Sequence, residues 1–137
     1  MNETQSDFVT KTGTSLTDLA QQCRERFLSI MPIDTDPTPW EELSQDVTSR
    51  WMEAAHVVGE FVAQQVETTF RQLARRMAIG YYGKDTWEKA GILEKFGFEI
   101  CARHVTNMVV AEDAADVKDA LDYNWGEWVL RKLDTED

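Results

Sequence analysis

Acidic side chains form the most distinct chemical pattern in the sequence, along residues 112–122. On a helical wheel of 100° per residue they cover roughly half of the circumference. They are Glu112, Asp113, Asp116, Asp119 and Asp122, with Ala114, Val117 and Leu121 on the opposite side and Lys118 as the single interruption. A solvated helix face is the ordinary explanation of such a run. The alternative is a row of carboxylates that imitates nucleic-acid phosphates or binds a basic groove.

Aromatic side chains beside this segment extend the predicted surface. Trp125 and Trp128 lie next to the acidic residues, where a partly exposed tryptophan can serve as a contact residue. For Trp51, which lies on an apolar stripe, we expect a place in the core. The predicted partner-binding residues are therefore Glu112, Asp113, Asp116, Asp119, Asp122, Glu127 and Trp125.

Metal ligation and catalysis find little support in the residue types. Cys101 and His104 form a C-x-x-H step on one helix face, and a closed zinc site would need Cys23 and His56 as well. These four residues are widely separated, so we expect ordinary core or surface positions with no metal and no cofactor. The Gly80 to Lys84 segment lacks the spacing of a phosphate loop, and no nucleophile motif is present. The sequence thus predicts a protein without catalytic residues, and a metal-dependent or thiol enzyme is the least favoured alternative.

The charge balance limits the partners further. Among 137 residues, 25 Asp and Glu face 14 Lys and Arg, for a net charge of −11. Arg71, Arg75 and Arg76 are the one basic concentration, and we expect them to pair with the protein's own carboxylates. Direct nucleic-acid binding is therefore disfavoured, whereas a basic protein would be attracted. Because no apolar stretch approaches the 18 residues of a membrane helix and no signal peptide is visible, we expect a cytoplasmic protein without membrane contact.

Helical periodicity and capping residues predict an all-α or α-rich fold, a compact bundle of about five helices including one long helix. Ser15 begins the first helix, and the proline-rich residues 32–39 form a linker. Thr38, Pro39 and Glu41 have the pattern of a second helix start, and Ser44 can cap again. Apolar residues from Val47 to Met77 then indicate one long helix or two collinear ones, ended by Gly80 to Gly83.

The remaining chain predicts three shorter helical regions. The first begins at Asp85 or Thr86, with Gly97 as a point of division, and its residues 105–111 fit either a helix or a short strand. Residues 112–123 form the next, capped by Asp113, and Asn124 with Glu127 opens the last. We expect a disordered arm at residues 1–14, one helical domain at 15–133 and a loose acidic tail at 134–137. No internal repeat at solenoid spacing is visible.

One short segment resembles proteins of a known setting. Pro39-Trp40-Glu41-Glu42-Leu43-Ser44, continuing to Trp51, Ala54 and Ala55, resembles a P-x-W-E-E-L-S-x(6)-W-x-x-A-A type element, here without a residue between Pro39 and Trp40. This element recurs in small uncharacterised proteins of tailed bacteriophages and prophages. The resemblance covers residues 39–55 and implies a helix-opening module with two packing tryptophans.

The resemblance implies function only by analogy. Small acidic phage proteins include anti-CRISPR and other anti-defence proteins, several of which act as DNA mimics. Together with the acidic face, this favours a phage-like, non-enzymatic inhibitor that binds the nucleic-acid-binding surface of a CRISPR effector or another nucleic-acid-handling enzyme in a bacterial host. The alternative is a phage structural or assembly adaptor whose apolar stripe forms a homo-oligomeric interface, such as a homodimer.

Overall fold

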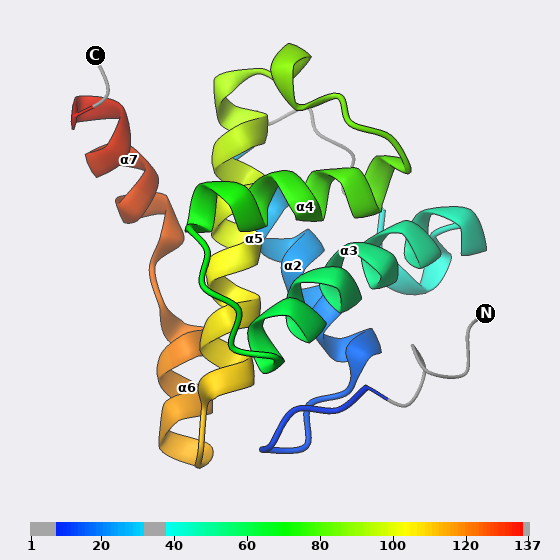
Figure 1. The fold of residues 1–137 in the computed structure, drawn as a ribbon, viewed down its shortest axis with the longest axis vertical. Helices are drawn as coiled ribbons and strands as arrows, with labels where there is room; N and C mark the ends of the chain where they lie inside the picture. The colour runs from blue at the N-terminus through cyan, green and yellow to red at the C-terminus, as the bar shows by residue number, and fades with distance from the viewer. Residues whose placement is uncertain (1–7, 32–37, 136–137) are drawn as a thin grey trace.

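The computed structural model describes residues 8–31 and 38–135, in which six α-helices follow one another (Figure 1). They are α2 (Leu16–Ser29), α3 (Gln45–Ala63), α4 (Phe70–Tyr82), α5 (Ile92–Val110), α6 (Ala114–Asp122) and α7 (Trp125–Thr135), with the 3₁₀ turns η1 (Trp40–Glu42) and η2 (Trp87–Lys89). The predicted helical fold is confirmed, with six α-helices in place of about five. Among these helices, none has the length and apolar character that crossing a membrane requires.

The side-chain caps explain where several helices begin. Ser15 Oγ accepts the Asp18 N–H at 3.2 Å, and Ser44 Oγ accepts the Val47 N–H at 3.3 Å, as both predicted caps require. The predicted helix start at residues 38–41 is wrong in one respect, because this segment leads only into the short 3₁₀ turn η1. The α-helix α3 begins later, after Ser44. At the far end of α4, Gly83 adopts φ +76°, a left-handed conformation in which glycine carries no steric cost.

The single long helix predicted between Val47 and Met77 is wrong. The chain leaves α3 at Ala63, passes Gln65 in a left-handed conformation with φ +57°, and starts α4 after Thr69. Thr69 and Gln72 form a reciprocal capping box there. The two helices pack on one another and are not collinear (Figure 1). The apolar periodicity of the sequence did not reveal this reversal of direction, because both helices bury an apolar stripe against the same core.

Helix α5 is continuous where we expected a division at Gly97 and considered a strand at residues 105–111. Gly97 is used for close packing, since a Cβ there would lie 2.6 Å from the ring of Phe27. Val105 and Met108 are fully buried, and apolar neighbours on several sides account for the run of residues that also fitted a strand. The ambiguity arose because α5 is covered by helices on more than one face.

The chain ends are more ordered than predicted within the described residues. Phe8 packs edge-on against His56 at a centroid distance of 5.9 Å, and Thr10 is buried. Residues 8–14 therefore do not belong to a disordered arm, and residues 1–7 lie outside the described part. Asp134, expected in a loose tail, belongs to α7, while residues 136 and 137 are not described.

The order of elements repeats itself along the chain. In residues 15–63 a hydroxyl-capped helix (α2) is followed by a tryptophan-led 3₁₀ turn (η1) and a helix of 19 residues (α3). In residues 69–110 the same order returns as α4, η2 and α5, again with 19 residues in the last helix. We call residues 15–63 the first repeat and residues 69–110 the second repeat. Two copies of one order of elements are not a series of repeats at solenoid spacing, so the expectation about solenoid repeats is not contradicted.

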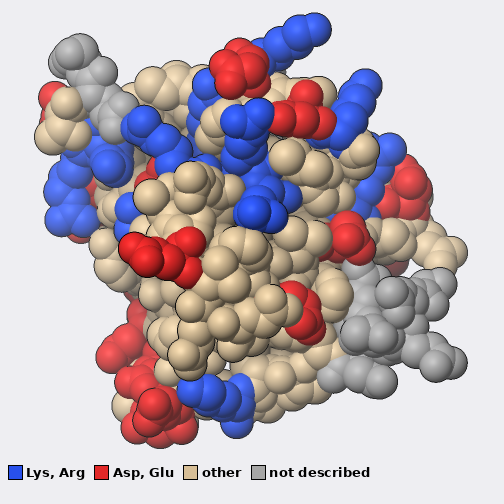
Figure 2. Space-filling model, in the orientation of Figure 1, with Lys and Arg blue, Asp and Glu red and all other residues tan. Residues whose placement is uncertain are grey.

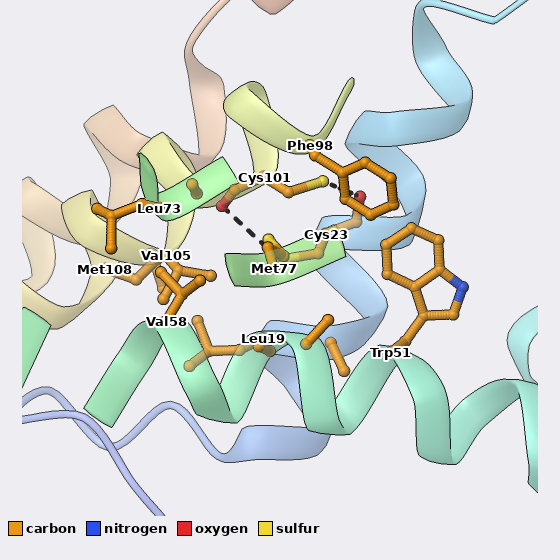
Figure 3. Close-up of a cluster of buried hydrophobic side chains, with 14 of the residues drawn as sticks. Leu19, Cys23, Trp51, Val58, Leu73, Met77, Phe98, Cys101, Val105 and Met108 are labelled. Carbon is orange, nitrogen blue, oxygen red and sulfur yellow. Dashed lines mark hydrogen bonds between the residues drawn. The ribbon is translucent and has the colours of Figure 1, made fainter. Parts of the chain in front are cut away.

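Equivalent positions of the two repeats carry similar side chains with similar burial. The caps Ser15 and Thr69 each accept the N–H of the third helical residue. The turns both begin with Trp-Glu, at Trp40 and Trp87. The buried equivalents are Leu19 and Leu73, Ala20 and Ala74, Cys23 and Met77, Trp51 and Phe98, Ala54 and Cys101, Ala55 and Ala102, and Val58 and Val105. Many of these side chains lie in the one buried cluster of Figure 3.

The two repeats pack on one another as if a two-fold axis related them, so that each contact has an equivalent when the repeats are interchanged. Helix α2 packs on α3 and α5, α4 packs on the same two helices, and α3 packs on α5. Four aromatic rings meet at this crossing, in the exchanged pairs Phe27 with Phe98 at 5.0 Å and Tyr81 with Trp51 at 4.8 Å. Phe27 and Tyr81 are equivalent, as are Trp51 and Phe98. The two halves therefore share one core and are not independent domains.

Gly97 offers a test of this crossing. Replacing it with Ala would gain about 1 kcal/mol of helix propensity, but the new methyl would collide with Phe27, whose ring is held by Trp51 and Phe98. We expect Gly97→Ala to lower the free energy of unfolding by about 1–3 kcal/mol in urea titrations. Gly126→Ala in α7 is the control, because a Cβ there meets nothing closer than 3.5 Å and should leave stability equal or higher. A stabilised Gly97→Ala variant would contradict the close packing.

Candidate partner-binding surface

The acidic residues lie on helix α6 and at the two positions before it, and two of them build the helix. The Asp113 carboxylate caps α6 by accepting the Asp116 N–H at 2.9 Å, which confirms the predicted cap. Asp116 in turn accepts the Glu112 N–H at 2.9 Å. Negative side chains in this first turn also complement the positive end of the helix dipole. Both carboxylates therefore have a structural role besides any contact with a partner.

Packing and one arginine hold α6 on the bundle. Ala120 is buried against the core and Val117 is half-buried, so the helix rests on the C-terminal part of α5 (Figure 1). Arg26 of α2 donates to the Leu121 carbonyl at 3.1 Å and to the Gln22 carbonyl at 3.2 Å. A cation at the last carbonyls of a helix is also favourable for its dipole. Arg26 thus positions the end of α6.

A hollow of about 340 Å³ lies between α5 and α6. Val110, Ala111 and Ala120 give it apolar walls, Tyr123 closes one side, and Asp116 and Asp119 supply carboxylates, with the Asn107 amide beside them. Val110 and Tyr123 are 54% and 43% exposed, so both side chains offer apolar contact area to a partner. The arrangement combines apolar contact area with negative charge at its edge.

The charge on this surface is unevenly compensated. Lys118 is paired with Asp122, and this pairing raises the pKa of the lysine. The Asp119 carboxylate makes no hydrogen bond or ion pair with side chains of the described residues, although its charge also raises the pKa of Lys118. Figure 2 shows acidic side chains gathered at the lower left, the position of α6 in Figure 1. Lysine and arginine concentrate around α4 in the upper half of the same view. The acidic residues of α6 therefore lie away from the lysine and arginine side chains around α4 in this view.

Two predicted contact residues lie on α7. Glu127 is exposed, and its N–H donates to Asn124 Oδ1 at 3.0 Å, as expected for the predicted helix start. Trp125 is only 6% exposed and packs with Trp128 and Phe96 in a second apolar cluster. The prediction of partly exposed contacts at Trp125 and Trp128 is wrong, because α7 turns its tryptophan side toward α5. Tyr123, which the sequence analysis treated only as a helix end, occupies the exposed position instead.

The Cys and His residues do not converge. Cys23 and Cys101 are buried neighbours, with Cys101 Sγ donating to the Cys23 carbonyl at 3.1 Å (Figure 3). His104 Nε2 lies 2.8 Å from Gln22 Oε1, whereas His56 lies beside Phe8 and 3.6 Å from Glu60. In residues 8–31 and 38–135 no three His, Cys, Asp or Glu side chains are grouped as metal ligands would be.

Sequence reasoning missed the residues that give the acidic surface its shape. Arg26, Asn107 and Val110 come from α2 and α5 and reach α6 only through the tertiary fold. Nothing in the sequence distinguished Val110 from the other apolar residues of the run 105–111. Comparison of the chain with protein-family models, with curated proteins and with solved structures finds no match.

The buried histidine beside α6 makes stability depend on pH. Burial, with a smaller effect of Arg26, lowers the pKa of His104 to about 3 from its ordinary value of 6.5. Below pH 6.5 the unfolded chain binds a proton that the folded chain does not. Each unit by which the pH is lowered therefore reduces the free energy of unfolding by about 1.4 kcal/mol. We expect the free energy of unfolding to drop by about 2 kcal/mol between pH 7 and pH 5.

The variant His104→Gln separates this effect from the titration of other groups. Its amide nitrogen can still reach Gln22 in place of Nε2 but binds no proton in this range. Urea unfolding at the two pH values should therefore show a smaller loss in the variant. An equal loss in both proteins would contradict a neutral, buried His104.

Proposed function

We propose that the protein is a non-enzymatic binding protein that uses the surface of α6 to bind a basic partner. The observation that carries this proposal is the hollow between α5 and α6, where exposed Val110 and Tyr123 stand beside Asp116 and Asp119. Apolar and tyrosine side chains contribute contact energy at interfaces, and charges at the edge contribute orientation and association rate. A lysine or arginine of the partner, with its apolar stem and cationic end, fits both requirements.

The proposal extends to a partner class through charge complementarity. Enzymes that handle nucleic acid present basic grooves, and residues 112–122, with five carboxylates against one lysine, offer the opposite charge. The resemblance of residues 39–55 to small tailed-phage proteins suggests the setting. We therefore infer an anti-defence inhibitor, acting in the bacterial cytoplasm on a CRISPR effector or a comparable nucleic-acid-handling enzyme. The protein itself is not expected to contact nucleic acid.

The adaptor hypothesis loses the observation that motivated it. It required an apolar stripe free for a second copy, yet Trp51, Val58 and Leu73 of that stripe are buried in the chain's own core. Phe61 is half-buried beneath Arg76, whose guanidinium lies 4.2 Å from the ring centroid. A homodimer through this stripe would require the core to open.

Charge removal at the hollow tests the proposal. Changing Asp116 and Asp119 together to Asn keeps acceptors for the α6 backbone but removes both charges. The partner is first captured from a host lysate, and its affinity is then measured by surface plasmon resonance at several salt concentrations. We expect at least about tenfold weaker binding for the double variant, since close charge pairs at interfaces are worth about 1.5 kcal/mol or more.

The matched control is Glu41→Gln with Glu42→Gln, which removes two exposed charges on η1. Its affinity should stay within about twofold of the unmodified protein at 0.15 M salt, where distant charges are screened. Equal weakening by both double variants would indicate general attraction in place of a defined surface. Affinity insensitive to the Asp116 and Asp119 changes and to salt would refute the proposal.

A further inference from the structure

A second hollow, of about 410 Å³, lies between the C-terminal end of α2 and the start of α7. Its lining includes Glu25, Arg26, Tyr123, Asn124, Trp125 and Gly126. The volume falls within the range of small-molecule sites. Tyr123 is the one lining residue that this hollow shares with the acidic hollow between α5 and α6, so the two are separate features of the surface.

Two of the side chains that line this hollow carry a buried donor without an acceptor. Arg26 Nε and Trp125 Nε1 are both shielded from water, yet neither has a hydrogen-bond partner among the described residues. Buried N–H groups in proteins are almost always paired, so each unpaired one requires an explanation. Two of them in the lining of a single hollow indicate a place where an acceptor from outside the chain would bind.

The start of α7 adds backbone donors to the same lining. Asn124 caps the helix by accepting the Glu127 N–H. The N–H groups of Trp125 and Gly126 lie ahead of this bond and have no acceptor among the described residues. They form the positive end of the dipole of an 11-residue helix, the part of a helix that attracts anions. Backbone and side-chain donors thus line one hollow.

Arg26 supplies a positive charge that no carboxylate of the described residues balances. Its terminal nitrogens donate to the backbone carbonyls of Gln22 and Leu121, at 3.2 and 3.1 Å. Glu25 is the one carboxylate in the lining, and it is exposed, so that water and salt screen its charge. Because Arg26 is half-buried and less screened, an anion in the hollow meets an attractive field.

We propose that this hollow binds a small organic carboxylate. Its oxygens accept hydrogen bonds from Arg26, from the Trp125 indole and from the first N–H groups of α7, and hydrogen bonds to a charged acceptor are the strong ones. The ring of Tyr123, 4.4 Å from that of Trp125, supplies apolar surface for the rest of the ligand. A carboxylate fits better than a phosphate, because one arginine balances its single negative charge. This binding is independent of the function proposed for α6.

Titration monitored by ¹H–¹⁵N NMR tests the site in the intact protein. The probes are benzoate, acetate, benzamide and inorganic phosphate. We expect benzoate to shift the Nε1–H signal of Trp125, which gains an acceptor, and the amide signal of Gly126. Benzamide has the same shape without the charge, and acetate lacks the ring, so both should bind more weakly. Phosphate or benzamide that binds as tightly as benzoate would contradict a carboxylate site.

Two tryptophan variants separate hydrogen bonding from packing. Trp125→Phe keeps an aromatic ring in the apolar cluster but removes the indole donor, and it should weaken benzoate binding, followed at the Gly126 amide, by about tenfold, the change expected from one hydrogen bond to a charged group. Trp128→Phe makes the same change in the same cluster at a position outside the lining and should leave the affinity unchanged. Equal weakening by both variants would overturn the proposal. So would the absence of saturable binding of either carboxylate at millimolar concentration.

Discussion

Contact among four aromatic rings is the interaction on which the rest of the structure depends. Phe27, Trp51, Tyr81 and Phe98 come from four different helices and meet where the two repeats cross, with exchanged pairs at 5.0 and 4.8 Å. Small residues around them let the helices approach closely, as at Gly80, where a Cβ would lie 3.2 Å from the Ala54 Cα. Because each repeat contributes half of this cluster, neither repeat has a complete core without the other.

The shared core leaves the outer surfaces of the two repeats free to differ. The first repeat is strongly acidic, whereas the second is basic. Helix α7 covers one face of α5 through Trp125 and Trp128, and α6 continues from the end of α5 with its carboxylates exposed. A net charge of −11 therefore describes the molecule poorly.

The helix starts could be predicted because capping depends on neighbouring residues. The features that were predicted wrongly depend on packing between segments distant in the sequence. Ser15, Ser44 and Asp113 cap helices as expected, because a cap needs only the next three residues. The reversal between α3 and α4 and the burial of Trp125 depend on partners distant in sequence, which periodicity does not identify. The repeat escaped notice because its equivalent residues agree in size and burial more than in identity. The acidic residues were found from sequence, but the apolar hollow beside them required the fold.

Double-mutant cycles on the two exchanged ring pairs test the central claim most directly. Phe27 with Phe98 and Tyr81 with Trp51 are changed to Leu singly and together, and the free energy of unfolding is measured in urea. If the repeats cross as described, each cycle yields a favourable coupling of about 0.5–1.5 kcal/mol. The two couplings should also be similar, because the pairs are equivalent. Coupling in one pair and none in the other would contradict a core built from two like halves.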